Sequence, residues 1–181
     1  MPTKLTILGC PPRSGDVPEH RFGGSSGSSW TWARIEPPDD QPWHACLQGG
    51  QTSYESAILL NTSPEAFIVA RGKGYWLNLT ERMAIHTTEC DMIGAAIAVP
   101  GQHIVIIADH TTACALRVDK IVWQTPRISL NGIHLVSATA NRITGSARGY
   151  GEAEDGWEPV ELDAVSGEVL RSPLCKNRSL E

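Results

Sequence analysis

Three short apolar runs follow one another in the middle of the chain: His103-Ile104-Val105-Ile106-Ile107-Ala108, Ala113 to Val118, and Ile121-Val122-Trp123. Each run has the length of a strand and is too short for a typical helix, and the runs are rich in β-branched residues. The polar pair Asp119-Lys120 between the second and third runs suits a tight turn. This stretch therefore predicts consecutive antiparallel strands.

The same pattern recurs on both sides of these runs. If Phe67, Ile104 and Ile143 are equivalent positions, they are separated by 37 and 39 residues. A period near 40 residues with several strands per unit is typical of propeller-type blades. We therefore predict an all-β protein with little helix, in which residues 57–172 form an antiparallel meander of about three blade-like repeats. The repeats are expected to build a twisted sheet or two packed sheets.

The N-terminal part predicts a separate β-hairpin over residues 30–50. Trp30-Thr31-Trp32-Ala33-Arg34-Ile35 alternates as a strand does, and places Trp30, Trp32 and Arg34 on one face. Pro37-Pro38-Asp39-Asp40 predicts a turn, and Trp43 to Leu47 predicts the returning strand.

The remaining segments complete the predicted organisation. Residues 10–29 are rich in Gly, Ser and Pro, which predicts a flexible loop or arm. Gly72-Lys73-Gly74 lacks the glycine spacing of a phosphate-binding loop and predicts a hairpin turn instead. We take residues 173–181 as a tail and residues 1–181 as a single domain, because one domain of this length can bury a sizeable core.

Composition excludes several classes of function. The formal net charge is −5, which disfavours nucleic-acid binding because that depends on many Lys and Arg residues. No stretch approaches the roughly 20 apolar residues that span a bilayer, so we expect no membrane partner. The five cysteines are an odd number at wide spacings, which favours reduced thiols and a cytoplasmic protein.

One segment carries a resemblance to a known family. Glu161-Leu162-Asp163-Ala164-Val165-Ser166-Gly167-Glu168-Val169-Leu170 resembles the strand–turn–strand that ends a blade in quinoprotein-like and WD-type propellers. The chain is also similar to small uncharacterised bacterial proteins in its segments 32–38, 123–128 and 131–135. The resemblance implies blade-like repeats over residues 57–172, but three repeats are fewer than the 4–8 blades of closed propellers. It brings no quinone-binding or peptide-binding residues to this sequence.

Two similar segments suggest a metal site. His86-Thr87-Thr88-Glu89-Cys90 and His110-Thr111-Thr112-Ala113-Cys114 offer two imidazoles and two thiols, a donor set that suits Zn²⁺. Four residues of extended strand span about 13 Å, however, which is too far for one coordination sphere. Cys90 and Cys114 also fit small buried residues at similar places in consecutive repeats. We therefore expect no cofactor, with zinc at His86, Cys90, His110 and Cys114 as the alternative.

The acidic segment and the tryptophans indicate a partner-binding surface. Between Gly149 and Leu170 there are seven acidic residues and no Lys or Arg, and we take Glu154, Asp155 and Glu158 as candidate contacts for a protein partner. Trp30, Trp32 and Trp43 cluster in the predicted hairpin, and Trp with Arg is typical of interface hot spots. Trp76, Trp123 and Trp157 fall once per repeat and are expected to pack in the core.

These features favour a binding module over an enzyme. Asp109 and His110 could act as an orienter and a base, but no nucleophile motif accompanies them. We predict a non-enzymatic interaction module, of the immunity or inhibitor type, that binds a protein partner. The alternatives are a small zinc-dependent or thiol enzyme built on the His/Cys segments, and a carbohydrate-binding domain that uses the tryptophans.

Overall fold

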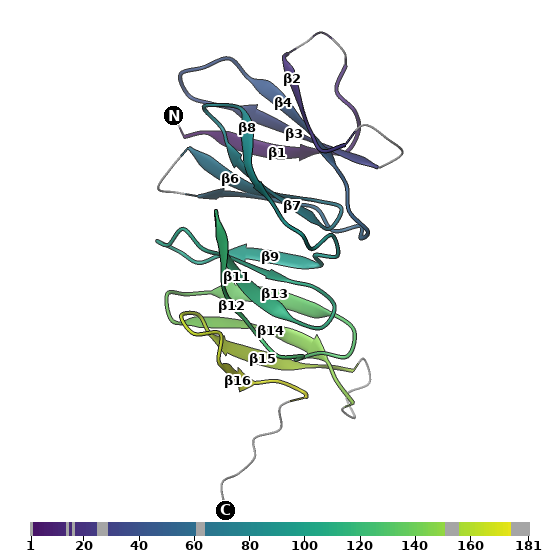
Figure 1. Ribbon diagram of the computed structural model, residues 1–181, viewed down its shortest axis with the longest axis vertical. Helices are drawn as coiled ribbons and strands as arrows, with labels where there is room; N and C mark the ends of the chain where they lie inside the picture. Colours follow the sequence, from purple (N-terminus) through teal and green to yellow (C-terminus); the bar gives the residue numbers. More distant parts are fainter. Residues whose placement is uncertain are drawn as a thin grey trace, which may run out of the picture. The chain divides into compact units, whose positions relative to one another are not determined.

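The computed structural model describes residues 2–13, 15, 17–24, 29–60, 64–150 and 156–174. Within these residues the chain forms sixteen β-strands and no helix (Figure 1). The strands build four sheets of four strands each, none of them closed into a barrel. This confirms the prediction of an all-β protein with little helix.

The chain divides into two compact units, Met1–Ile93 and Gly94–Glu181. The first unit contains the sheets β1-β3-β4-β2 and β5-β6-β7-β8. The second unit contains the sheets β12-β11-β10-β9 and β13-β14-β15-β16. We predict a single domain for residues 1–181, and the division into two units does not test whether they fold as one domain.

The first sheet contains the predicted hairpin and two further strands. β3 (Trp30–Glu36) pairs with β4 (Trp43–Gln48) in antiparallel fashion, which confirms the hairpin. β1 (Lys4–Leu8) pairs with the other edge of β3. β2 (Glu19–Phe22) pairs with β4 in parallel, so this part of the predicted loop is a strand. Its mostly polar sequence does not predict a strand, because backbone pairing with β4 rather than an apolar pattern holds it in place.

The other three sheets are antiparallel meanders in sequence order, as expected for the repeats. Their twelve strands lie between residues 56 and 171, which agrees closely with the predicted range of 57–172. The strands are β5 (Ser56–Leu60), β6 (Glu65–Ala70), β7 (Lys73–Asn78), β8 (Met83–Thr87), β9 (Ala95–Ala98), β10 (Val105–Ala108), β11 (Ala113–Arg117), β12 (Lys120–Gln124), β13 (Ile133–Ala138), β14 (Arg142–Arg148), β15 (Trp157–Asp163) and β16 (Val169–Arg171).

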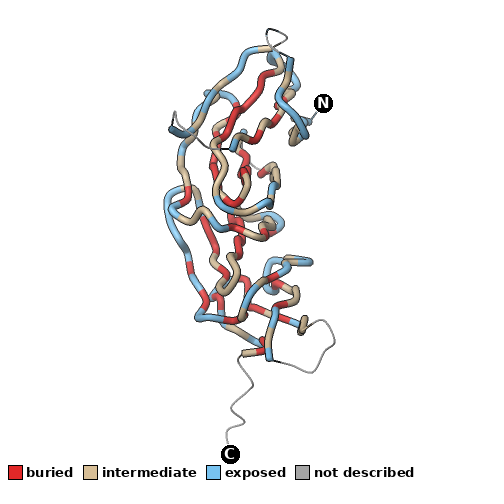
Figure 2. Tube along the Cα trace, turned by 90° about the vertical axis from the view of Figure 1, so that its right-hand side faces the viewer, coloured by how far each residue is buried: buried red, intermediate tan, exposed pale blue. Residues whose placement is uncertain are grey.

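Each unit has a core shared by its two sheets. In the first unit Ile35 and Leu47 of one sheet join Ile68 and Leu77 of the other in one apolar cluster. In the second unit Ile106 lies in a cluster with the side chains of β14 and β15. Figure 2 shows buried stretches of the chain alternating with exposed ones in both units. Facing sheets bury apolar surface that one sheet alone would leave in water.

A buried threonine holds the same hydrogen bonds in two consecutive repeats. Thr88 follows β8, and its Oγ1 accepts a bond of 2.9 Å from the N–H of Gly74. Thr125 follows β12, and its Oγ1 accepts a bond of 3.0 Å from the N–H of Ala113. In both repeats the threonine N–H donates to the carbonyl of the same partner. The shared pattern supports the equivalence of these repeats.

A second shared feature is a bulge in the last strand of each of the three meanders. Ile85 of β8 is the extra residue opposite Trp76 and Leu77. Val122 of β12 and Leu170 of β16 are extra residues at the corresponding places. All three side chains are exposed.

Candidate functional site

Trp30, Trp32 and Arg34 lie on one face of β3, as the alternation predicts. Thr31, Ala33 and Ile35 on the opposite face are buried, whereas Trp30, Trp32 and Arg34 are half-buried. The buried face packs on the core of the first unit. We call the three half-buried residues the tryptophan face.

The neighbouring strands extend this face. Trp32 pairs with Leu8 of β1 and with Cys46 of β4, and Trp30 pairs with Gln48. The Nε of Arg34 lies 2.6 Å from Glu36 Oε1, so an ion pair holds the guanidinium beside the tryptophans. Large aromatic rings beside an arginine combine apolar area with directional hydrogen bonding, which suits a protein interface.

The thiol in this face is not a nucleophile. Cys46 is buried, and burial followed by the nearby Glu19 carboxylate raises the pKa of its thiol to about 11. A thiol with such a pKa stays neutral at pH 7, and thiolate is the reactive form.

Trp43, which the sequence groups with Trp30 and Trp32 as a candidate partner contact, is not exposed. Trp43 pairs with Ile35 of β3, and its exposed fraction is 0%. This register places its ring in the core of the first unit, where His20 of β2 meets it edge-on at 5.3 Å between ring centroids. Trp43 is therefore a core residue, and it does not belong to the tryptophan face.

The acidic segment is only partly described. Glu154 and Asp155 lie outside the described residues. Glu158 lies in β15, is half-buried, and its carboxylate lies against Gly149. Partner binding by these three acids stays a prediction.

The four candidate zinc ligands are split between the two units. His86 and Cys90 belong to the first unit, and His110 and Cys114 belong to the second. In the described part of the chain no group of three or more His, Cys, Asp or Glu residues could hold a metal ion. The zinc site stays a prediction, and no cluster of metal-binding side chains among the described residues supports it.

Asp109 has a structural role in the turn between β10 and β11. Its carboxylate accepts hydrogen bonds from the N–H groups of Thr111 and Thr112, at 2.6 and 2.7 Å, and from both of their hydroxyl groups. Burial alone would raise the pKa of this carboxyl, but the four hydrogen bonds outweigh burial and hold the pKa below its ordinary value. A carboxylate used in this way stabilises the turn.

We expect Asp109→Asn to lower the free energy of unfolding by about 1 kcal/mol at pH 7, because the charged acceptor is lost. A lowered native pKa means that the carboxylate stabilises the fold above the unfolded pKa of about 3.9, and that this contribution disappears as the pH falls through the native value. Urea unfolding followed by circular dichroism from pH 7 downward tests this. The gap between wild type and variant should close at acidic pH.

Asp119→Asn is the matched control for this experiment. Asp119 lies in the exposed turn between β11 and β12. Its substitution should change stability little at any pH. A gap for Asp109→Asn that persists unchanged at low pH would contradict the role of its charge.

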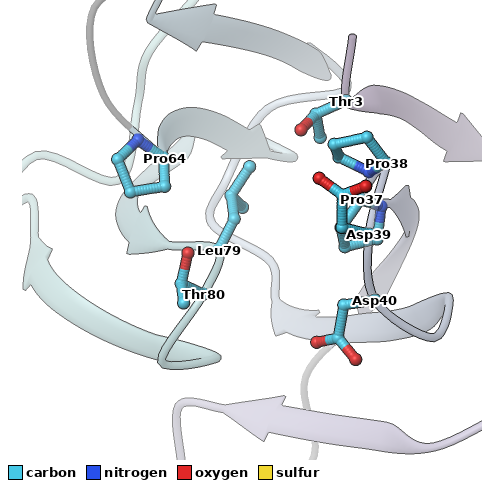
Figure 3. A pocket seen from close by; sticks show the side chains of 8 residues that line it. All are labelled: Thr3, Pro37, Pro38, Asp39, Asp40, Pro64, Leu79 and Thr80. Carbon is cyan, nitrogen blue, oxygen red and sulfur yellow. The ribbon is translucent and has the colours of Figure 1, made fainter. Parts of the chain in front are cut away.

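A pocket of about 320 Å³ opens in the first unit at the turn between β3 and β4. Pro64, Leu79 and Thr80 face Thr3 and the turn residues 37–40 across it (Figure 3). Asp40 in this turn accepts a hydrogen bond of 2.7 Å from Arg82 Nη2. This bond is the main reason why the pKa of Asp40 is lowered, and a hydrogen bond from the N–H of Gln41 lowers the pKa further. The ion pair ties the turn to the loop that follows β7.

The second unit carries an aromatic cluster that the sequence interpretation missed. The rings of His134 and Trp157 stack with centroids 4.1 Å apart, and the guanidinium of Arg148 lies 5.3 Å from the Trp157 ring. Trp157 was expected in the core, like Trp76 and Trp123, but it is only half-buried. Trp157 pairs with Arg148, which places it on the polar face of β14 and β15. This register could not be predicted from the sequence alone.

The described strands are joined by turns and loops, and none of the described residues forms a helix long and apolar enough to cross a membrane. No protein-family model matches the chain, and the comparison with curated proteins finds no match either.

Proposed function

We propose that the protein is a non-enzymatic binding module whose tryptophan face contacts a protein partner. The observation that carries the proposal is the half-buried pair Trp30 and Trp32 beside Arg34, on the side of β3 that faces away from the core. Binding would remove two large aromatic surfaces from water, and Trp and Arg are the residues most enriched among interface hot spots.

The state of two side chains that could act in catalysis, Asp109 and Cys46, favours binding rather than catalysis. The Asp109 carboxylate is occupied by four hydrogen bonds within its own turn. The Cys46 thiol has a pKa near 11 and stays neutral. An inhibitor or immunity protein needs a rigid complementary surface and no reactive group, which agrees with this arrangement.

We place this function in a reducing compartment such as the cytoplasm. Cys10, Cys46, Cys90 and Cys114, the cysteines within the described ranges, form no disulfide. Reduced thiols are the rule where glutathione and thioredoxin keep cysteines reduced.

The test compares three tagged proteins in a pull-down from cells that naturally express the protein, read by quantitative mass spectrometry. We expect Trp30→Ala/Trp32→Ala to recover the specific partner at a level at least about tenfold lower than wild type, because two hot-spot side chains are lost. The double variant should keep its melting temperature within a few degrees, since both rings lie outside the core.

Val136→Ala is the control, because Val136 is an exposed apolar residue of the second unit. It should recover the partner as wild type does. Equal recovery by the double variant and the control would contradict the proposal, and so would the absence of any partner that wild type enriches over the tag alone.

A further inference from the structure

Arg71 occupies an unfavourable backbone position in the turn between β6 and β7. Ala70 pairs with Lys73, so Arg71 and Gly72 form a two-residue hairpin loop. Their φ values are 47° and 94°, as in a type I′ turn. The first position of this turn favours Asn, Asp or Gly, because other side chains are strained at positive φ. An arginine here breaks a local rule, which is expected mainly where the side chain has a function.

The turn around Arg71 is held rigidly from both sides. The carbonyl of Arg71 accepts a hydrogen bond of 2.9 Å from the N–H of Thr52. The N–H of Gly72 donates to the carbonyl of Tyr54 at 3.0 Å, and the carbonyl of Gly72 accepts from the N–H of Ile93 at 2.9 Å. Gly72 is itself buried, which is unusual for a hairpin turn. The position of Arg71 is therefore fixed before any ligand arrives.

The Arg71 side chain has no partner for its charge among the described residues. Its Nε is buried and makes no hydrogen bond there, and none of its other donors reaches an acceptor in that part of the chain. A buried donor without an acceptor is costly, and native structures rarely keep one without a reason. The Arg71 side chain passes close to Gly49, where a Cβ atom would lie 3.0 Å from Arg71 Cδ.

A second arginine shows how the same strain is compensated elsewhere. Arg82 is the other described residue besides glycine with positive φ, at 54°. Its Nη2 lies 2.7 Å from Asp40 Oδ2, so its charge is paired. Arg71 has the same backbone strain without the ion pair. Lys73, half-buried at the end of the same turn, also lacks an acidic partner within the described ranges.

We propose that Arg71, with Lys73 at the end of the same turn, binds an oxyanion, either a carboxylate or a phosphate group of a ligand. The planar guanidinium donates two parallel hydrogen bonds to such a group, and the lysine adds a positive charge. Arg71 Nε is itself closed off from solvent, so the ligand would bind the part of the half-buried side chain that remains exposed. The inference does not rest on the tryptophan face, and either one stands if the other fails.

The test measures melting temperatures of wild type and Arg71→Asn with inorganic phosphate or acetate, with potassium chloride added to hold ionic strength constant. We expect at least one of the two anions to raise the melting temperature of wild type and neither to raise that of the variant. Without either anion, Arg71→Asn should melt about 2 to 4 °C above wild type, because Asn relieves the turn strain and removes the orphan donor. A shift with phosphate alone identifies a phosphate-bearing ligand, and a shift with acetate identifies a carboxylate.

Arg82→Asn is the matched control. Without anions, loss of its ion pair with Asp40 and relief of the same turn strain act in opposite directions on its melting temperature, and it should keep the full anion-dependent shift. Equal anion shifts in wild type and Arg71→Asn would overturn the proposal. The absence of any shift in wild type with both anions would overturn it as well.

Discussion

Trp43→Ala is expected to lower the free energy of unfolding by about 3 to 5 kcal/mol, the usual cost of removing a fully buried aromatic side chain. Trp43 is completely buried in the core shared by the two sheets of the first unit, and His20 packs against its ring. Because the surrounding strands cannot collapse fully into the space, the variant would keep a cavity. Chemical unfolding followed by far-ultraviolet circular dichroism measures the change.

Substitution by phenylalanine separates the size of the ring from its N–H group. Trp43 Nε1 is buried and has no acceptor among the described residues, so Trp43→Phe removes a donor that makes no bond. We expect it to cost clearly less than Trp43→Ala, because phenylalanine still fills most of the space of the indole. Trp76→Phe is the comparison, because Trp76 Nε1 donates a bond of 2.7 Å to Glu65. A loss for Trp43→Phe as large as for Trp43→Ala would contradict this assignment.

Gly145→Ala is expected to destabilise the second unit by about 3 kcal/mol, at the upper end of overpacking effects. A Cβ at Gly145 would clash with the carbonyl oxygen of His134 in the neighbouring strand. That atom belongs to the backbone and cannot move unless β13 separates from β14. The bulge at Val136 follows directly on the pairing of Leu135 with Gly145.

The control for this substitution is Gly94→Ala. A Cβ at Gly94 would have its nearest neighbour, the carbonyl of Ala108, at 3.9 Å, an ordinary contact distance. We expect a change within about 0.5 kcal/mol, as for most substitutions that meet no special feature. If both variants unfold at the same denaturant concentration, the close approach at Gly145 does not matter for stability.

The strands with an apolar pattern could be predicted from sequence, but their register could not. Alternation along residues 30–35 correctly placed Trp30 and Trp32 on one face, because side-chain direction within a strand has a fixed period of two. The face of Trp43 depends on its pairing with Ile35 across a loop of six residues. Such a loop allows several registers, and a slip of one residue exchanges the two faces.

Features fixed by distant partners also escaped prediction. β2 has the sequence Glu19-His20-Arg21-Phe22, which carries no strand pattern, and it exists because β4 offers it a parallel edge. Gly72-Lys73-Gly74 correctly indicated a hairpin turn, but the turn residues are Arg71 and Gly72. Arg71 Nε finds no acceptor in the part of the chain that the structure describes, and Gly72 beside it is buried. Both are properties of packing, which the local sequence does not encode.

The bulges in β8, β12 and β16 have a consequence for how copies of this protein behave in concentrated solution. Each of these strands forms the free edge of its sheet and exposes an apolar side chain, which is the usual starting point of aggregation. A bulge twists the strand and interrupts the regular spacing of its N–H and C=O groups. A strand from another copy therefore cannot align along the edge over its full length. We therefore expect the three repeated bulges to hinder edge-to-edge association between copies of this protein.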